Sequence, residues 1–124
     1  MKRALLLAVI VVASLARAQT GAANHSIIFK FDYDFRVTHA CSSGVKKNCV
    51  EQFVAYDISA GLAKRTKLAS MPAPSGATGF VKGLSVTTPS LLFEPGRHLL
   101  AVTAQAPDGT ESDPMKCTTW VELP

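Results

Sequence analysis

The chain has 124 residues, of which 48% are hydrophobic, and a formal net charge of +4 at pH 7. A chain of this length can bury one modest core, so it predicts a single domain. Residues 1–18 contain three of the 13 Lys and Arg residues, which leaves 10 basic against 9 acidic residues in the remainder. A charge of +1 on that remainder gives no reason to expect nucleic-acid binding.

Residues 1–18 have the pattern of a secretory signal peptide. Lys2 and Arg3 precede an uncharged run over residues 4–16, and an Ala-Arg-Ala cleavage pattern follows at residues 16–18. That run of 13 residues is shorter than the roughly 20 that a membrane-spanning helix needs. We therefore expect a cleavable helical signal peptide over residues 1–18, a secreted or periplasmic location, and no stable membrane insertion after cleavage.

After the predicted signal peptide, which we also call the leader, the sequence changes near residue 26 from small and polar residues to an alternating pattern. Residues 19–25 are small or polar without periodicity, which predicts a flexible N-terminus or a weak first strand. Residues 27–38 alternate apolar and polar side chains with period two, the strongest strand signal in the chain. We expect the apolar members of this strand to face a core: Ile27, Phe29, Phe31, Tyr33, Phe35 and Val37.

Two aspartates lie on the polar face of this strand. Asp32 and Asp34 are flanked on that face by Lys30 and Arg36, so the simplest interpretation is a solvated row of weak ion pairs. A calcium site would need about six to eight oxygen ligands from several loops. A glycosidase pair would need two carboxylates that face each other across a substrate. We therefore predict neither a metal site nor a catalytic site here.

Three cysteines follow, at Cys41, Cys49 and Cys117. An oxidising compartment predicts that at least one pair is bridged. The polar, Gly-containing loop at residues 42–48 favours a Cys41–Cys49 disulfide, with a pairing of either residue to Cys117 as the alternative. Cys117 is expected on an inward face as an inert thiol, or else in an intermolecular contact with another chain.

Five further strands are predicted, at residues 50–58, 62–68, 80–88, 97–105 and 115–123. The first of these is apolar on both faces, as in a central strand, and the second is short and basic, as in an edge strand. Gly83 in the third indicates a bulge. Six or seven short strands without a helical period predict an all-β fold, a single antiparallel two-sheet β-sandwich over residues 26–124.

The segment over residues 93–114 resembles the last two strands of fibronectin type III and bacterial immunoglobulin-like domains. A Pro-Gly turn precedes alternating apolar residues, and a second turn with Asp and Gly follows. The matching positions are Pro95, Gly96, His98, Leu100, Val102, Ala104, Asp108 and Gly109. The resemblance implies an immunoglobulin-like or fibronectin type III-like sandwich, and a bias toward binding, linking or adhesion. No Arg-Gly-Asp tripeptide occurs, so it does not imply integrin binding.

The sequence contains no recognisable catalytic motif. Neither H-E-x-x-H nor G-x-S-x-G occurs, and the three histidines, His25, His39 and His98, are scattered. His98 is expected to point inward in a hydrogen-bonded structural role. We therefore predict no enzyme, no catalytic residue, no cofactor and no metal.

Trp120 is the one candidate for ligand contact. It is predicted on the outward face of the last strand with Lys116 and Glu122, where an indole suits carbohydrate or protein contact. Alternatively, the Lys116 stem or a neighbouring strand covers it. The expected function is a secreted non-enzymatic interaction or structural module, with an unknown protein or cell-surface polymer as partner. The alternative is a carbohydrate-binding module that uses Trp120 and neighbouring loops, and a small secreted hydrolase is a distant third.

Overall fold

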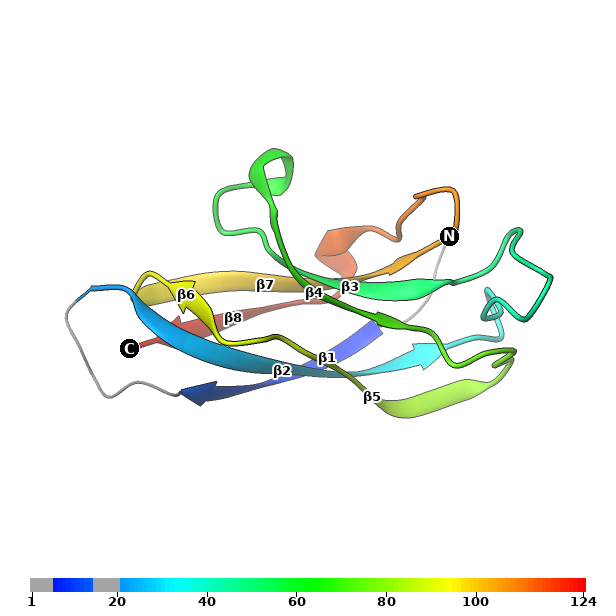
Figure 1. The fold of residues 1–124 in the computed structure, drawn as a ribbon, viewed down its shortest axis with the longest axis horizontal. Helices are drawn as coiled ribbons and strands as arrows, with labels where there is room; N and C mark the ends of the chain where they lie inside the picture. The colour runs from blue at the N-terminus through cyan, green and yellow to red at the C-terminus, as the bar shows by residue number, and fades with distance from the viewer. Residues whose placement is uncertain (1–5, 15–20) are drawn as a thin grey trace.

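The computed structural model of the chain describes residues 6–14, by their backbone alone, and residues 21–124. Within these residues, eight strands fold into two antiparallel sheets that pack face to face (Figure 1). The strands are β1 (Leu6–Ser14), β2 (Ala23–Asp34), β3 (Gln52–Asp57), β4 (Thr66–Pro72), β5 (Phe80–Thr87), β6 (Leu91–Phe93), β7 (Gly96–Gln105) and β8 (Thr118–Leu123). The predicted all-β, two-sheet sandwich is confirmed.

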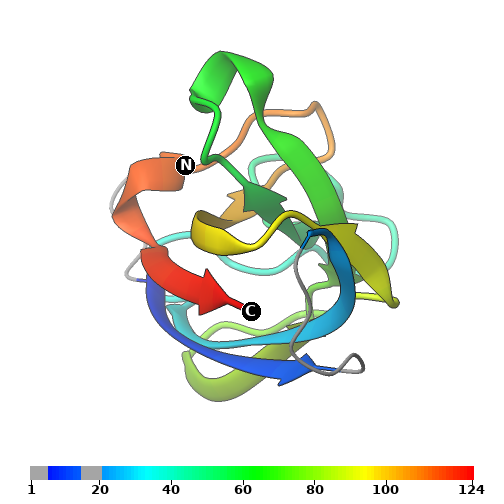
Figure 2. The same ribbon diagram turned by 90° about the vertical axis from the view of Figure 1, so that its left-hand side faces the viewer.

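The first sheet has the strand order β1-β2-β5, with β6 also paired to β2, and the second has the order β4-β3-β7-β8. Figure 2 shows the sheets stacked, with β8 above β1. Seven of the eight described strands follow residue 20, within the predicted six or seven. The edge strand predicted at residues 62–68 is displaced, because residues 62–64 form a 3-10 turn and β4, which lies at an edge, begins at Thr66; β6 was not predicted. In the described part of the chain the helices are one-turn 3-10 segments, η1 (Leu62–Lys64) and η2 (Pro114–Lys116), so none is long enough to cross a membrane.

The apolar run of the leader is a strand in the intact chain, and the helical signal peptide expected over residues 1–18 stays a prediction. Residues 6–14 form β1, which runs antiparallel to β2 from the pair Leu6 and Tyr33 to the pair Ser14 and His25. Valine and isoleucine suit a strand as well as an apolar leader, and β2 offers them an otherwise open row of backbone groups. The cleavage pattern at residues 16–18 lies outside the described residues, so cleavage stays a prediction.

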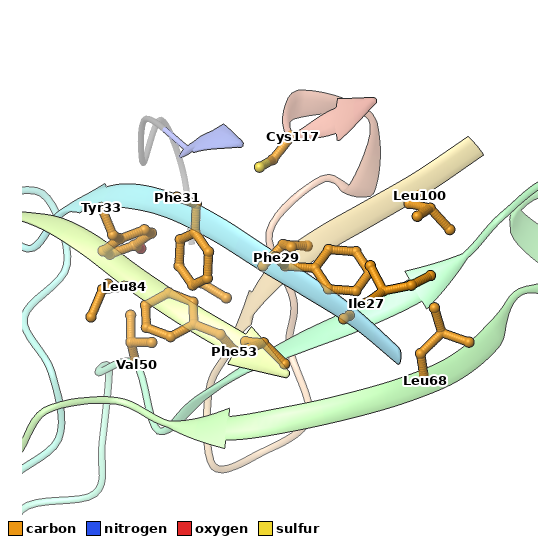
Figure 3. Packing of buried hydrophobic residues seen from close by; sticks show 14 of the residues in the cluster. Ile27, Phe29, Phe31, Tyr33, Val50, Phe53, Leu68, Leu84, Leu100 and Cys117 are labelled. Atoms are coloured by element: carbon orange, nitrogen blue, oxygen red, sulfur yellow. The ribbon is translucent and has the colours of Figure 1, made fainter. Parts of the chain in front are cut away.

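The aromatic row of β2 forms one half of the core, as the alternation predicts. Phe29, Phe31 and Tyr33 are buried, and Figure 3 shows them directed toward the opposite sheet. From that sheet, Phe53 of β3 meets Phe31 and Tyr33 edge to face, with ring centroids 4.9 and 5.1 Å apart. Such aromatic pairs add about 0.5–1.5 kcal/mol each beyond the area they bury.

The strand ends sooner than its periodicity predicts. After Asp34 the chain turns, and its carboxylate accepts a hydrogen bond from the backbone N–H of Arg36 at 2.9 Å. An aspartate that bonds a backbone group two residues onward favours a turn over continued pairing. Val37 is consequently 51% exposed instead of facing the core, while Phe35 remains buried.

The second sheet is buried on both faces at its centre. Phe53 and Ala55 of β3 face the first sheet, whereas Val54, Tyr56 and Ile58 are buried on the opposite face. Loops cover that outer face: the Arg65 guanidinium lies 4.7 Å from the Tyr56 ring centroid, and the Tyr56 hydroxyl hydrogen-bonds Glu111. The doubly apolar sequence of this strand is therefore explained, and the predicted central strand is confirmed.

Candidate functional site

Trp120 lies on the outward surface of β7 and β8. It is 55% exposed and pairs across the ladder with Leu99, so both side chains project from the same face. The inward positions of β8 are taken by Val121 and Leu123, as the alternation predicts. The indole is therefore placed on the surface by strand register, not by a flexible loop.

Arg97 is part of this site, although the sequence pattern did not single it out. Its guanidinium carbon lies 4.4 Å from the Trp120 ring centroid, a cation–π contact that covers one face of the indole. Arg97 pairs in register with Glu122, which places it diagonally across from Trp120. Its position on the neighbouring strand could have identified it, because residues diagonal to each other across a ladder are within reach of long side chains. We call the exposed group Arg97, Trp120 and Glu122 the Trp120 surface.

A cleft of about 660 Å³ opens between the disulfide loop and the turn after β7. Its polar lining includes His39, Lys46 and Lys47 on one side and Asp108 on the other. Asp108 accepts a hydrogen bond from the backbone N–H of Thr110 at 2.9 Å, and this bond lowers the pKa of its carboxyl group. Its carboxylate thus serves the turn, because it replaces a backbone acceptor there.

His98 occupies a polar corner at the end of the core. Its Nδ1 lies 2.7 Å from a carboxylate oxygen of Asp57, and its Nε2 lies 2.6 Å from the carbonyl oxygen of Glu94. Burial opposes ionisation of Asp57, but hydrogen bonds from Ser59 and His98 outweigh it and lower the pKa of this carboxyl. The arrangement ties β3 to the start of β7, which matches the structural role expected for His98.

The two aspartates of β2 do not converge on a site. Asp34 binds the Arg36 guanidinium through two hydrogen bonds of 2.8 and 3.0 Å. Asp32 instead accepts a hydrogen bond of 3.0 Å from the backbone N–H of Gly83. The β2–β5 register shifts at this point and Gly83 has a φ of 75°, so Asp32 holds a β-bulge. The bulge at Gly83 was predicted, and its carboxylate partner was not.

The cysteines are arranged as favoured by the sequence. Cys41 and Cys49 form a disulfide that closes a loop of sequence separation 8 between the two sheets. Cys117 is a free thiol, buried before β8, and burial raises its pKa to about 12. A thiol with such a pKa is almost wholly protonated at neutral pH, and therefore a poor nucleophile. Among the described residues, no three His, Cys, Asp or Glu side chains are grouped closely enough to hold a metal ion.

A scan against protein-family models gave no match, and searches of curated proteins and of solved structures found no significant similarity to this chain.

Proposed function

We propose that this protein is a secreted, non-enzymatic binding module of the immunoglobulin-like or fibronectin type III-like class, and that it binds a protein partner through the Trp120 surface. The class is supported by strand order. In the part of the chain that follows the leader, β2 and β5 share one sheet, and β3, β7 and β8 share the other, with β4 beside β3. This division corresponds to the B-E and C-F-G strands of immunoglobulin-like sandwiches, with β4 in the position of an additional C′ strand, and β1 holds the position of strand A only until cleavage.

The exposed indole under a guanidinium is the observation that carries the proposed binding role. Trp and Arg are the residues most often found to dominate the energy of protein interfaces. Here the Arg97 contact and the β7–β8 ladder hold Trp120 in one orientation, so little side-chain freedom is lost on binding. Arg97 and Glu122 provide charges at the rim, where complementary charges guide a partner into register.

Trp120→Ala tests the proposal directly. The secreted form would be immobilised and exposed to the extracytoplasmic fraction of its source cells, and retained proteins identified by mass spectrometry. We expect a specific partner for the wild-type protein and a loss of at least about tenfold in its affinity for the variant. The matched control is Leu92→Ala, because Leu92 is 68% exposed on the other sheet and should leave binding unchanged. Equal binding by both variants would contradict the proposal.

Carbohydrate binding remains the second candidate because the same exposed indole could stack on a sugar ring. The chain has one Trp, so quenching of its intrinsic fluorescence would report on Trp120 alone. Since Arg97 covers one face of the ring, Arg97→Ala should strengthen a sugar contact on that face and weaken a protein contact. Glycan-dependent quenching that increases in this variant would favour the carbohydrate over the protein partner.

A further inference from the structure

The edge of β2 is covered by a segment that the secreted protein is expected to lose. In the intact chain β1 pairs with nine consecutive residues of β2, while β5 and β6 pair with β2 on its other side. Cleavage after residue 18 would remove β1 and leave the row of backbone N–H and C=O groups beside it without protein partners. Long open edges of this kind recruit another strand unless charge, proline or a covering loop blocks them.

The same removal would uncover part of the core. β1 also lies beside β8, and Figure 2 shows it below that strand. Cys117 and Leu123 are buried on the inner side of this region, and Figure 3 draws Cys117 next to β1. Cleavage would therefore create a groove with two kinds of wall: a backbone ladder along β2, and apolar side chains along β8. We call this the β2–β8 groove.

The register of β1 describes the kind of segment that fits the groove. Its sequence, LLAVIVVAS, is uncharged and aliphatic, and it runs antiparallel to β2. The core-facing positions of β2, from Tyr33 to His25, are paired with Leu6, Ala8, Ile10, Val12 and Ser14. His25 is fully buried, and neither ring nitrogen has a hydrogen-bond partner among the described residues. A polar residue opposite His25 would therefore suit the end of a bound strand.

We propose that leader cleavage opens the β2–β8 groove as a second binding site, which takes an uncharged, aliphatic β-strand from a partner chain, antiparallel to β2. This inference rests on the secretion in the proposed function and does not depend on the Trp120 surface. The secreted chain supplies no such strand for a second copy. Its uncharged stretches of ten or more residues are 19–29, 68–81, 83–93 and 98–107, and their strand-forming parts belong to strands that its own sheets already use. Binding would restore the ladder and cover the core, which is the mode called strand addition.

The test begins with the full chain. A site-specific protease sequence replaces residues 15–20, so that the leader can be cut from the folded protein. The probe is a synthetic peptide of residues 6–14 with added terminal lysines for solubility. We expect the cut protein to exchange its leader for the peptide. Cys117 should react with a thiol reagent at least about tenfold faster when the groove is empty, and at the original rate when the peptide is bound.

Register-specific crosslinking locates the bound peptide. Val9 pairs with Lys30 on the outward face, so a peptide with Val9→Cys should form a disulfide with the cut Lys30→Cys protein. The matched control is Lys67→Cys, an exposed position on the edge strand β4, which should not react. An Ile10→Pro peptide should not bind, because proline lacks the N–H that a ladder needs.

The outcomes separate clearly. Crosslinking at residue 30 alone, with protection of Cys117, supports the groove even if Trp120→Ala shows that the proposed function is wrong. Equal crosslinking at residues 30 and 67, a cut leader that never exchanges, or an unfolded cut chain that the peptide does not rescue would overturn the inference. A dimer that protects Cys117 without peptide would overturn it in favour of a second copy as the occupant.

Discussion

The two sheets of this protein bury their residues in different ways. In the first sheet, β2 has one buried aromatic face and one polar face that carries Lys30 and Asp32. In the second sheet, β3 and β7 are buried on both faces, because Arg65 and Glu111 close over Tyr56 on the outside. The difference shows that the solvent exposure of a strand's outer face depends on which loops cover it. The position of the strand relative to the core between the sheets does not decide it.

Alkaline unfolding is the strongest test of this comparison. Burial raises the pKa of Cys117 from 9.0 to about 12. Burial, and to a smaller extent the negative charge of the neighbouring Asp34, raise the pKa of Tyr33 from 10.0 to about 12. Burial and the Glu111 hydrogen bond do the same for Tyr56. Since all three bind their protons more tightly when folded, this stability is fully present below pH 9 and is lost as pH rises toward about 12.

Circular dichroism and tyrosinate absorbance between pH 8 and 12 would measure this loss. We expect little change in the free energy of unfolding up to about pH 9, then a steep fall with cooperative unfolding near pH 12. Tyrosines that ionise near pH 10 while the sandwich remains folded would contradict the burial of both residues.

Phe53→Ala should cost more stability than loss of the disulfide or of either tyrosine hydroxyl. Its ring lies between the sheets, 4.9 Å from Phe31 and 5.1 Å from Tyr33 between centroids, so its removal leaves a cavity in the shared core. We expect a loss of about 3–5 kcal/mol in the free energy of unfolding, measured by urea denaturation. The control is Phe80→Ala, which removes a ring that is 42% exposed and should cost far less. Similar costs for both would show that the core does not lie between these faces.

Loss of the disulfide tests how the two sheets are joined. The double variant Cys41→Ala, Cys49→Ala opens the loop between β2 and β3 and gives the unfolded chain more freedom. The chain-entropy model predicts a loss of about 2–3 kcal/mol for a loop this short. Urea denaturation of the oxidised wild type and the double variant would measure it. A reduced wild-type protein should match the variant, and a mismatch would indicate that the substitutions themselves disturb the loop.

The two buried tyrosines should respond oppositely to removal of their hydroxyls. Tyr56→Phe deletes a 2.6 Å hydrogen bond to Glu111 and should cost about 1–2 kcal/mol. The Tyr33 hydroxyl has no partner among the described residues, so Tyr33→Phe should be neutral or slightly stabilising. Thermal unfolding of both variants under one buffer would compare them. Equal destabilisation would contradict the different environments of the two sheets.

Asp34→Asn should have the smallest effect. Hydrogen bonds from the Arg36 side chain and backbone lower the pKa of Asp34 below its ordinary 3.8. The stabilisation is therefore present above that value and is lost as pH falls through the lowered pKa. Because the Arg36 side chain is 68% exposed, solvent screens the pair and the change at neutral pH should be close to the measurement error. Urea denaturation from pH 2 to 5 would measure the effect. We expect the free energy of unfolding of the variant to depend less on pH than that of the wild type, and the same pH dependence in both would exclude a role for the pair.

Much of the fold could be predicted from residue pattern alone. Alternation placed Phe29, Phe31 and Tyr33 in the core, and the doubly apolar sequence of residues 50–58 identified a central strand. The polar, Gly-containing loop between Cys41 and Cys49 favoured the observed disulfide. These features are local, since each depends on side-chain period or on short sequence separation.

Most of the features that were missed depend on contacts between distant segments, and one depends on a local turn. Arg97 reaches Trp120 because β7 and β8 pair in one register, and Asp32 meets Gly83 because a bulge shifts β5 against β2. Val37 was placed inward because periodicity has no marker for the turn that Asp34 starts. Nothing in the local sequence of residues 6–14 separates an apolar strand from an apolar leader, so their pairing with β2 appears only in the structure.

The sequence by itself therefore determined the fold class and the core face of β2 and favoured the observed disulfide, because period and proximity act within a single segment. Only the tertiary structure decided which side chains share the Trp120 surface, which carboxylate holds the bulge, and which edge the leader covers. Those arrangements follow from the register between strands, and register depends on every strand in a sheet at once.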